Sequence, residues 1–197
     1  MRPKTFDQTR ALEAAMLQFW ESGFEGSSMQ NLVDRMGISR QSLYDTYGNK
    51  RDLFESALKR YVEEIIEPKL AGLFDASRSP TDLIRNHLES IATGHAQMPI
   101  GCLVVRTATE TSVEDAEIGK ILDDCVKKAR SAIRQVIERG QQTGEFDSGR
   151  SAGDLASIVI TSGIGFHVMR RLPDEGRSIR PSVDSIIAGL KASTTEH

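Results

Sequence analysis

Residues 37–54, GISRQSLYDTYGNKRDLF, gather side chains that can read nucleic-acid bases and hold phosphates. An arginine can bond O6 and N7 of a guanine, and a glutamine can bridge N6 and N7 of an adenine. Hydroxyl groups and helix N-termini bind phosphate oxygens. The side chains of this kind are Ser39, Arg40, Gln41, Ser42, Tyr44, Thr46, Tyr47 and Lys50. They predict a helix that enters the major groove of DNA, with Tyr47 and Lys50 flanking the groove as backbone contacts.

Two short helices must present these side chains. Glycine tolerates the left-handed conformation that ends a helix, so Gly37 predicts one helix over residues 28–36 and another over 39–45. Each is too short to be stable alone in water, and both need support from the longer helices on either side. Spacings of three, four and seven residues place the predicted inner face together: Leu32, Val33, Met36, Ile38 and Leu43. On the pattern alone, an ordinary solvent-exposed face explains the outward residues equally well.

The rest of the chain shows the helical period almost throughout. Apolar residues recur at intervals of three and four, and proline is rare, which predicts an all-α fold. Thr5 with Gln8 is expected to cap the first helix, and Asn49 with Asp52 a long fourth helix that Pro68 kinks or ends. Later helices are predicted over residues 79–97, 102–110, 112–142 and 151–172, with a last one from 181. The total is about nine helices.

No enzyme or metal motif is evident. Gly163 and Gly165 lack the third glycine and the preceding strand of a dinucleotide-binding loop, and there is no P-loop, HExxH or CxxC sequence. We therefore predict a protein without enzymatic activity, cofactor or metal site. Only two cysteines, Cys102 and Cys125, occur in the 197 residues, and neither a signal-type leader nor a membrane-length apolar run is evident. These features favour a soluble cytoplasmic protein without membrane contact.

The stretch SSMQNLVDRMGISRQSLYDTYGNKRDLF resembles the DNA-binding domain of the TetR family of bacterial transcriptional repressors. The residues that carry the resemblance are Gly37-Ile38-Ser39, Leu43-Tyr44 and Asn49-Lys50 before Leu53-Phe54. Thr46-Tyr47 departs from the family pattern, since many members have His-Phe there. The resemblance implies that Ser28 and Gln30 contact phosphates and bases, that residues 39–44 belong to the recognition helix, and that Lys50 contacts a phosphate.

The resemblance also implies two domains, a helix-turn-helix domain over residues 1–48 and a helical ligand-binding and dimerisation domain over 49–197. Because one recognition helix makes few base contacts, a homodimer is expected to bind a palindromic operator. The last two helices, about 151–172 and 181–192, are the predicted dimer interface, although their apolar stripes also suit the chain's own core. These stripes comprise Leu155, Ile158, Val159, Ile164, Phe166, Val183, Ile186, Ile187 and Leu190.

A small-molecule inducer is expected to bind the intervening helices and to release the operator, repression being the prevalent mode in the family. The predicted ligand contacts are Tyr61, His87, Cys102, Arg106 and Glu110. Arg106 is expected to pair with an anionic ligand, and His95 to share one helix face with His87. Two alternatives stay open at this point: a redox- or electrophile-sensing regulator acting through Cys102, and a helical protein-interaction module without a DNA partner.

Overall fold

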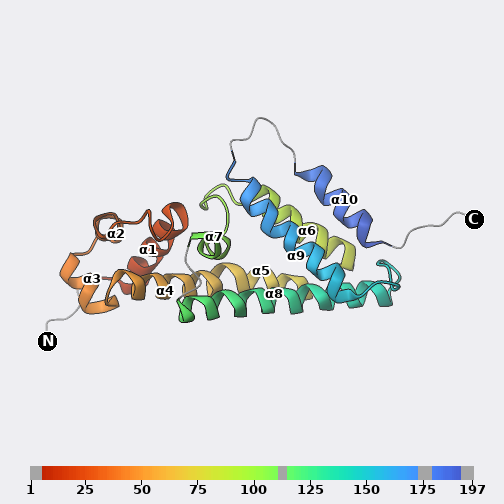
Figure 1. Cartoon of the computed structure of the whole chain (residues 1–197), viewed down its shortest axis with the longest axis horizontal. Coiled ribbons are helices and arrows are strands. Elements are labelled where there is room, and N and C mark those ends of the chain that lie inside the picture. The colour runs from red at the N-terminus through yellow and green to blue at the C-terminus, as the bar shows by residue number, and fades with distance from the viewer. Residues whose placement is uncertain (1–5, 111–114, 173–178, 192–197) are drawn as a thin grey trace, which may run out of the picture. The chain divides into compact units, whose positions relative to one another are not determined.

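The computed structural model describes residues 6–110, 115–172 and 179–191, and Figure 1 shows helices in every part of them. These ranges contain ten α-helices, a π-helical turn and a 3-10 turn, and no strand, so the all-α prediction is confirmed. Because α4, the π turn and α5 form one unbroken run, nine separate helical stretches result. The chain divides into two compact units, unit 1 (Met1–Ile66 with Cys102–Asp123) and unit 2 (Glu67–Gly101 with Asp124–His197). The domain boundary after residue 48 stays a prediction.

Unit 1 has an aromatic core. Its elements are α1 (Gln8–Ser22), α2 (Met29–Met36), α3 (Arg40–Tyr47), α4 (Lys50–Tyr61), the π turn (Val62–Ile66), α7 (Leu103–Glu110) and the first turns of α8 (Ala116–Gln142). The ring of Phe54 on α4 meets the rings of Phe19 and Phe24 at 4.9 and 5.0 Å between centroids, and Tyr61 meets Trp20 at 4.7 Å. Such rings bury large apolar areas. They fix α1 against α4, while α2 packs on α1, and α3 packs on α2 and α4.

Local capping sets the ends of these helices. The carboxylate of Asp7 accepts the backbone N–H groups of Thr9 and Arg10 at 2.9 and 3.2 Å, so α1 begins at Gln8 and not after Thr5. Thr5 itself lies outside the described residues. At α4, Asn49 and Asp52 form the predicted reciprocal capping box, in which each side chain accepts the other's backbone N–H.

Proline 68 does not end the helical run. It is the second residue of α5 (Glu67–Ala71), which directly follows the π turn and continues into a 3-10 turn at Gly72–Phe74. Proline lacks an N–H and clashes with the carbonyl four residues before it. A wider π turn at that place changes the hydrogen-bond pattern and lets the chain stay helical through the proline.

Unit 2 contains α5, the 3-10 turn, α6 (Pro80–Thr93), the greater part of α8, α9 (Ala152–Met169) and α10 (Arg180–Leu190). Helix α6 packs against α9 and α10. It begins as predicted, since the Ser79 hydroxyl accepts the N–H of Asp82 at 3.0 Å and Pro80 occupies the first turn. The predicted end at residue 97 is wrong, because Gly94 leaves the helix with φ 66°. Helix α9 likewise ends at Met169 and not at residue 172.

Candidate nucleic-acid interface

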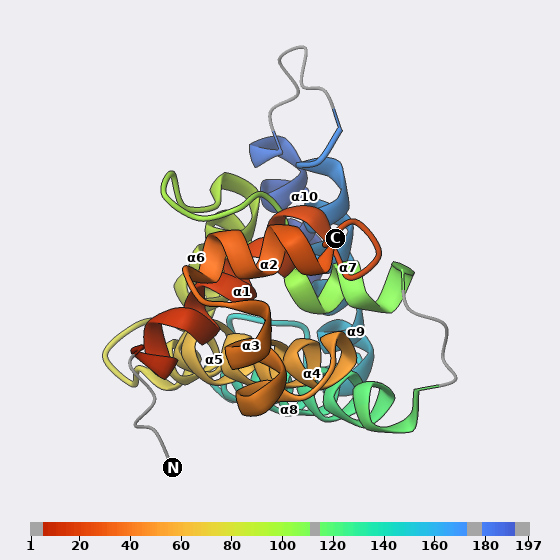
Figure 2. The same ribbon diagram turned by 90° about the vertical axis from the view of Figure 1, so that its left-hand side faces the viewer.

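The position of α3 depends on one buried side chain. Leu43 has no exposed surface, whereas Arg40, Gln41 and Tyr44 are exposed, and Tyr44 keeps 46% of its surface open. The turn before α3 is tight because Gly37 takes φ 65°, in the left-handed region that favours glycine. In Figure 2, α2 and α3 lie on the side of unit 1 that faces the viewer. The residues predicted to read bases therefore share one accessible side of a short helix.

The polar residues of this accessible side differ in what they already bind. The Ser39 hydroxyl caps α3 by accepting the N–H of Ser42 at 3.1 Å, and the two hydroxyls lie 2.9 Å apart. The Gln41 amide donates to Asp45 at 2.8 Å and must leave it to reach a base. Within the described residues, no hydrogen bond or ion pair engages the side chain of Arg40. Arg40 is thus the side chain that can meet a guanine at the lowest cost.

Helix α2 places two further predicted contacts at its N-terminus. Ser28 is the N-cap and accepts the N–H of Asn31 at 3.1 Å, and the Gln30 amide donates to Asp34 at 2.8 Å. Both residues are exposed. A helix N-terminus with exposed hydroxyl and amide groups suits phosphate oxygens.

The three residues at the end of the recognition stretch are more enclosed than the sequence indicated. Oγ1 of Thr46 is buried and has no hydrogen-bond partner among the described residues, so the predicted contact requires the hydroxyl to turn outward. The Tyr47 hydroxyl donates to the carbonyl of Gln8 at 2.9 Å, and burial raises the pKa of this phenol. The Lys50 ammonium lies 4.4 Å from the ring centre of Phe24, a cation–π contact that it must give up to reach a phosphate.

Two of the predicted ligand contacts, Arg106 and Glu110, form an ion pair, and Arg106 also holds the end of α1. The guanidinium of Arg106 donates to the carbonyls of Glu21 and Ser22, both at 2.8 Å, and its Nε lies 2.5 Å from a carboxylate oxygen of Glu110. These carbonyls are among the last of α1, which have no partner within their own helix. An anionic ligand would therefore have to compete with two backbone carbonyls and Glu110 for this cation, and its binding to Arg106 stays a prediction.

Of the other predicted ligand contacts, Tyr61 and Cys102 are buried and His87 is half-buried. Tyr61 is 1% exposed in the aromatic core of unit 1, and Cys102 is 5% exposed directly before α7. His87 lies on α6 in unit 2, where burial lowers the pKa of its imidazole to about 4. His95 does not share its helix face, because α6 ends at Thr93 and His95 is exposed beyond it.

The sequence reading missed His167 on α9. Its Nδ1 is buried and has no hydrogen-bond partner among the described residues. Burial lowers the pKa of this histidine to about 4, with further repulsion from Lys69 and Arg170. The signal was available, since His167 lies within residues 155–169, a stretch that contains no Asp, Glu, Lys or Arg.

A short helix exposed in this way after a tight turn, in an all-helical chain, places the protein among the helix-turn-helix DNA-binding regulators. Two family models narrow this class. "Bacterial regulatory proteins, tetR family" matches residues 11–57, and "Tetracyclin repressor-like, C-terminal domain" matches residues 81–186. The chain belongs to the TetR family of bacterial transcriptional regulators, which bind DNA and are not enzymes.

Curated relatives and solved structures agree with this assignment. The uncharacterized HTH-type transcriptional regulator YezE of Bacillus subtilis is 34% identical over 151 residues, which cover 74% of this chain and 76% of the relative. The HTH-type transcriptional repressor ComR of Escherichia coli is 30% identical over 160 residues, covering 80% and 76%. A cysteine mutant of the TetR family regulator CifR, complexed with a 26-bp operator duplex, superimposes with a TM-score of 0.82 at 27% identity, covering 96% of this chain and all of that one.

Proposed function

We propose that the protein represses transcription by binding a palindromic operator in the cytoplasm as a homodimer, and that a small apolar or amphipathic molecule releases it. The observation that carries this proposal is the accessible side of α3, where Arg40, Gln41 and Tyr44 are exposed over the buried Leu43. The operator complex of CifR and the repressor name of ComR support it. An interaction module without DNA is set aside, since the chain belongs to a family of DNA-binding regulators.

Helices α9 and α10 support the proposal of a homodimer. Part of the predicted stripe is used by unit 2 itself, since Leu155, Val159 and Phe166 are buried. Another part is open, and Ile158 and Ile164 keep 40% and 41% of their surfaces exposed. A second copy of the chain would cover the open part.

Helix α9 is also apolar and long enough to cross a membrane. One such helix is weak evidence for a membrane span, because core helices of soluble proteins have the same length and composition.

Glycines on α9 and α10 favour the homodimer. A Cβ on Gly163 would lie 3.2 Å from Ile91, so packing within unit 2 accounts for that glycine. No atom lies within 4 Å of a Cβ built on Gly165 or Gly189, both within helices. Glycine in a helix interior costs about 1 kcal/mol relative to alanine. Close approach of a partner helix explains why α9 and α10 carry glycine at positions where the chain itself has room.

Release of the operator requires a ligand that prefers the state in which the dimer does not fit DNA. In unit 2, His87 and His167 are half-buried, desolvation lowers the pKa of both imidazoles, and the buried Nδ1 of His167 lacks a partner among the described residues. A mostly apolar ligand with one hydrogen-bonding group would suit them. Loss of operator affinity in the presence of a molecule found by thermal shift tests this part, and a ligand that leaves operator affinity unchanged contradicts it.

A thiol-reactive signal at Cys102 is the second candidate. Its support is that two of the similar solved structures are cysteine mutants of CifR, and that Cys102 directly precedes α7, which holds α1 through Arg106. Its burial limits attack by a reagent. If diamide or a maleimide releases the operator from the wild type but not from Cys102→Ser, modification of the Cys102 thiol is the releasing signal. Equal release from both proteins excludes Cys102 as the sensor.

The DNA-binding part is tested by selecting bound genomic fragments with purified protein and measuring the affinity of the enriched duplex against a scrambled duplex. We expect a palindromic sequence with strong preference over the scrambled one. Equal affinity for the two duplexes contradicts the proposal.

A further inference from the structure

The segment Cys102–Asp123 joins the DNA-reading helices although it lies far from them in the sequence. It belongs to unit 1, and its helix α7 packs on both α1 and α4. Here "the brace" means its described residues, 102–110 and 115–123. Two of its side chains, Arg106 and Asp115, make specific polar contacts with the helices that hold α2 and α3.

The first contact closes the C-terminal end of α1. Arg106 donates hydrogen bonds from its two terminal nitrogens, one to the carbonyl of Glu21 and one to that of Ser22. Its side chain also forms an ion pair with Glu110 and is only 14% exposed. A cation at a helix C-terminus is also favoured by the helix dipole. The chain leaves α1 at Gly23, which has φ 77°, and a Cβ there would lie 2.0 Å from the Glu110 carboxylate. The glycine therefore provides both the turn and the space for this ion pair.

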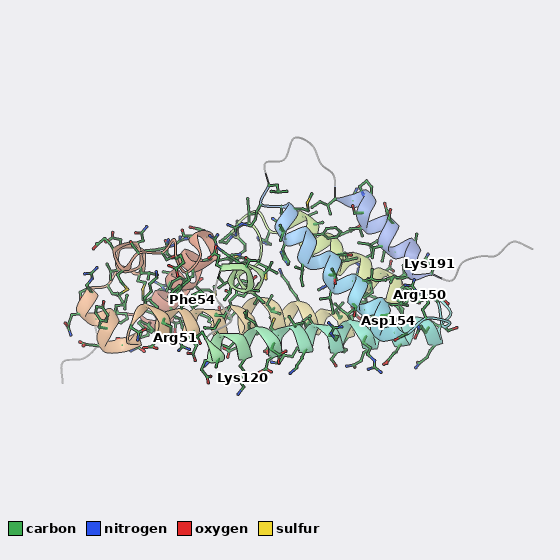
Figure 3. All side chains as sticks on the ribbon, in the orientation of Figure 1. Arg51, Phe54, Lys120, Arg150, Asp154 and Lys191 are labelled. Atoms are coloured by element: carbon green, nitrogen blue, oxygen red, sulfur yellow. The ribbon has the colours of Figure 1, made fainter. Side chains whose placement is uncertain are left out.

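The second contact holds the N-terminal end of α4. The Asp115 carboxylate receives two hydrogen bonds of 2.7 Å from Nε and Nη2 of Arg51, a bidentate geometry that adds orientation as well as energy. The same carboxylate accepts the N–H of Ile118 at 3.1 Å and thus caps the start of α8. Arg51 and these hydrogen bonds hold the pKa of Asp115 at about 2. Figure 3 shows Arg51 on α4, and Lys120 on the first turns of α8.

The recognition helix takes its position from the two helices that the brace holds. Only Leu43 anchors α3 in the core, and α3 passes directly into α4 through Gly48 and the Asn49 cap. At its other side, the Tyr47 hydroxyl bonds the first residue of α1. A shift of α4 or α1 would therefore move the side chains of α3 relative to the bases.

We propose that Arg106 and Asp115 are positioning residues for operator recognition, which fix α1 and α4, and through them α3, without touching DNA themselves. The proposal rests on DNA reading by α3. Arg106 and Asp115 lie outside the residues matched by the family's DNA-binding model, which end at residue 57.

The test compares the full-length protein with Asp115→Asn, Arg51→Gln and the double variant on an operator and a scrambled duplex. We expect Asp115→Asn to lose on the order of tenfold in operator affinity, and Arg51→Gln at least as much, because it also removes the ion pair with Glu55. The double variant should lose no more than Arg51→Gln, because both single variants break the Arg51–Asp115 contact. Affinity for the scrambled duplex should not fall in Asp115→Asn, since non-specific binding depends on phosphate contacts and this variant removes a negative charge. A loss confined to the operator separates positioning from general destabilisation.

Glu138→Gln is the matched control, because Glu138 pairs with Arg134 at 2.7 Å on the same helix α8 but in unit 2. It should leave operator affinity unchanged. If Asp115→Asn binds the operator as well as the wild type or better, Arg51 is instead a direct phosphate contact or the ion pair is irrelevant, and the proposal is overturned. A wild type without preference between the duplexes would contradict the proposed function and this inference with it, whereas an unaffected Asp115→Asn beside a discriminating wild type would contradict this inference alone.

Arg106→Lys tests the contact at α1. Lysine keeps the charge but loses the planar fork that reaches two carbonyls, so the operator affinity should again fall while that for the scrambled duplex holds. Hydrogen exchange at the end of α1 should accelerate in the same variant. Unchanged exchange together with unchanged operator affinity would overturn the role of Arg106. Should Asp115→Asn fail to fold, Arg51→Lys tests the same contact at α4. It should also lose operator affinity, and wild-type affinity in this variant would contradict the proposal.

Discussion

Helices α3 and α9 both expose side chains that the chain's own fold does not use, but the chemistry of these side chains is opposite. Helix α3 is eight residues long, buries Leu43 and presents arginine, glutamine and tyrosine. Helix α9 is 18 residues long, buries one apolar row and leaves another, including Ile158 and Val168, open to solvent. Side chains that form hydrogen bonds with bases and phosphates are suited to a DNA interface. Exposed apolar side chains are suited to an interface with a second protein chain. The difference separates the proposed DNA-reading surface from the proposed dimer surface.

The largest expected effect concerns the anchor of α3. Leu43→Ala should lower the free energy of unfolding by about 2–5 kcal/mol, because it removes a fully buried side chain and leaves a cavity. The neighbouring Tyr44→Ala should change stability by no more than about 0.5 kcal/mol and instead weaken operator binding. Urea denaturation and fluorescence anisotropy measure the two quantities. Similar stability losses in both variants would show that Tyr44 is part of the core.

The pH dependence of unit 2 gives the next effect. Burial lowers the pKa of His87 and His167 to about 4, and an unfolded histidine titrates near pH 6.5. Between these values the unfolded state binds more protons than the native state, so stability falls on acidification, by roughly 1–3 kcal/mol per histidine. His87→Gln should flatten the dependence in urea denaturation at pH 4.5 and pH 7. The exposed His95→Gln serves as control, and equal flattening in both would contradict the assignment.

The smallest effect distinguishes the glycines of α9 and α10. Gly165→Ala and Gly189→Ala should each stabilise the isolated chain by about 0.5–1 kcal/mol, since alanine favours helix and meets open space. The same variants should weaken the dimer measured by sedimentation, because the added methyl group obstructs a close partner helix. Gly163→Ala, whose methyl group would meet Ile91, should affect the chain itself first. Unchanged dimerisation in all three would exclude these glycines from the interface.

Features that depend on neighbours in the sequence were predictable from it. The turn at Gly37, the cap at Ser39, the capping box of Asn49 with Asp52 and the start of α6 at Pro80 all follow from local hydrogen bonding, and the structure has them. Periodicity likewise indicated that Leu43 faces inward. The sequence pattern indicated Thr5 as the first cap, but the structure has Asp7 in that role, and aspartate is the better N-cap residue of the two.

Features that depend on tertiary packing were not predictable. Arg106 resembled a ligand contact because its neighbours are apolar, but the carbonyls that it binds lie more than 80 residues earlier in the chain. The spacing of eight residues predicted that His95 shares a helix face with His87, but α6 ends at Thr93 with Gly94 as its C-cap, so His95 lies outside the helix. The split of the α9 stripe between core and surface also needs the positions of α6 and α10. Periodicity shows which residues share a face, but not what covers that face.

The most direct test of DNA reading by α3 is the affinity of the wild type and Arg40→Ala for an operator and for its single-base-pair variants. We predict that the wild type discriminates at a G·C pair, and that Arg40→Ala loses about 1–3 kcal/mol there while tolerating the substituted base pair equally well. An Arg40→Ala protein that keeps both its affinity and its base preference would contradict a reading role for this face of α3.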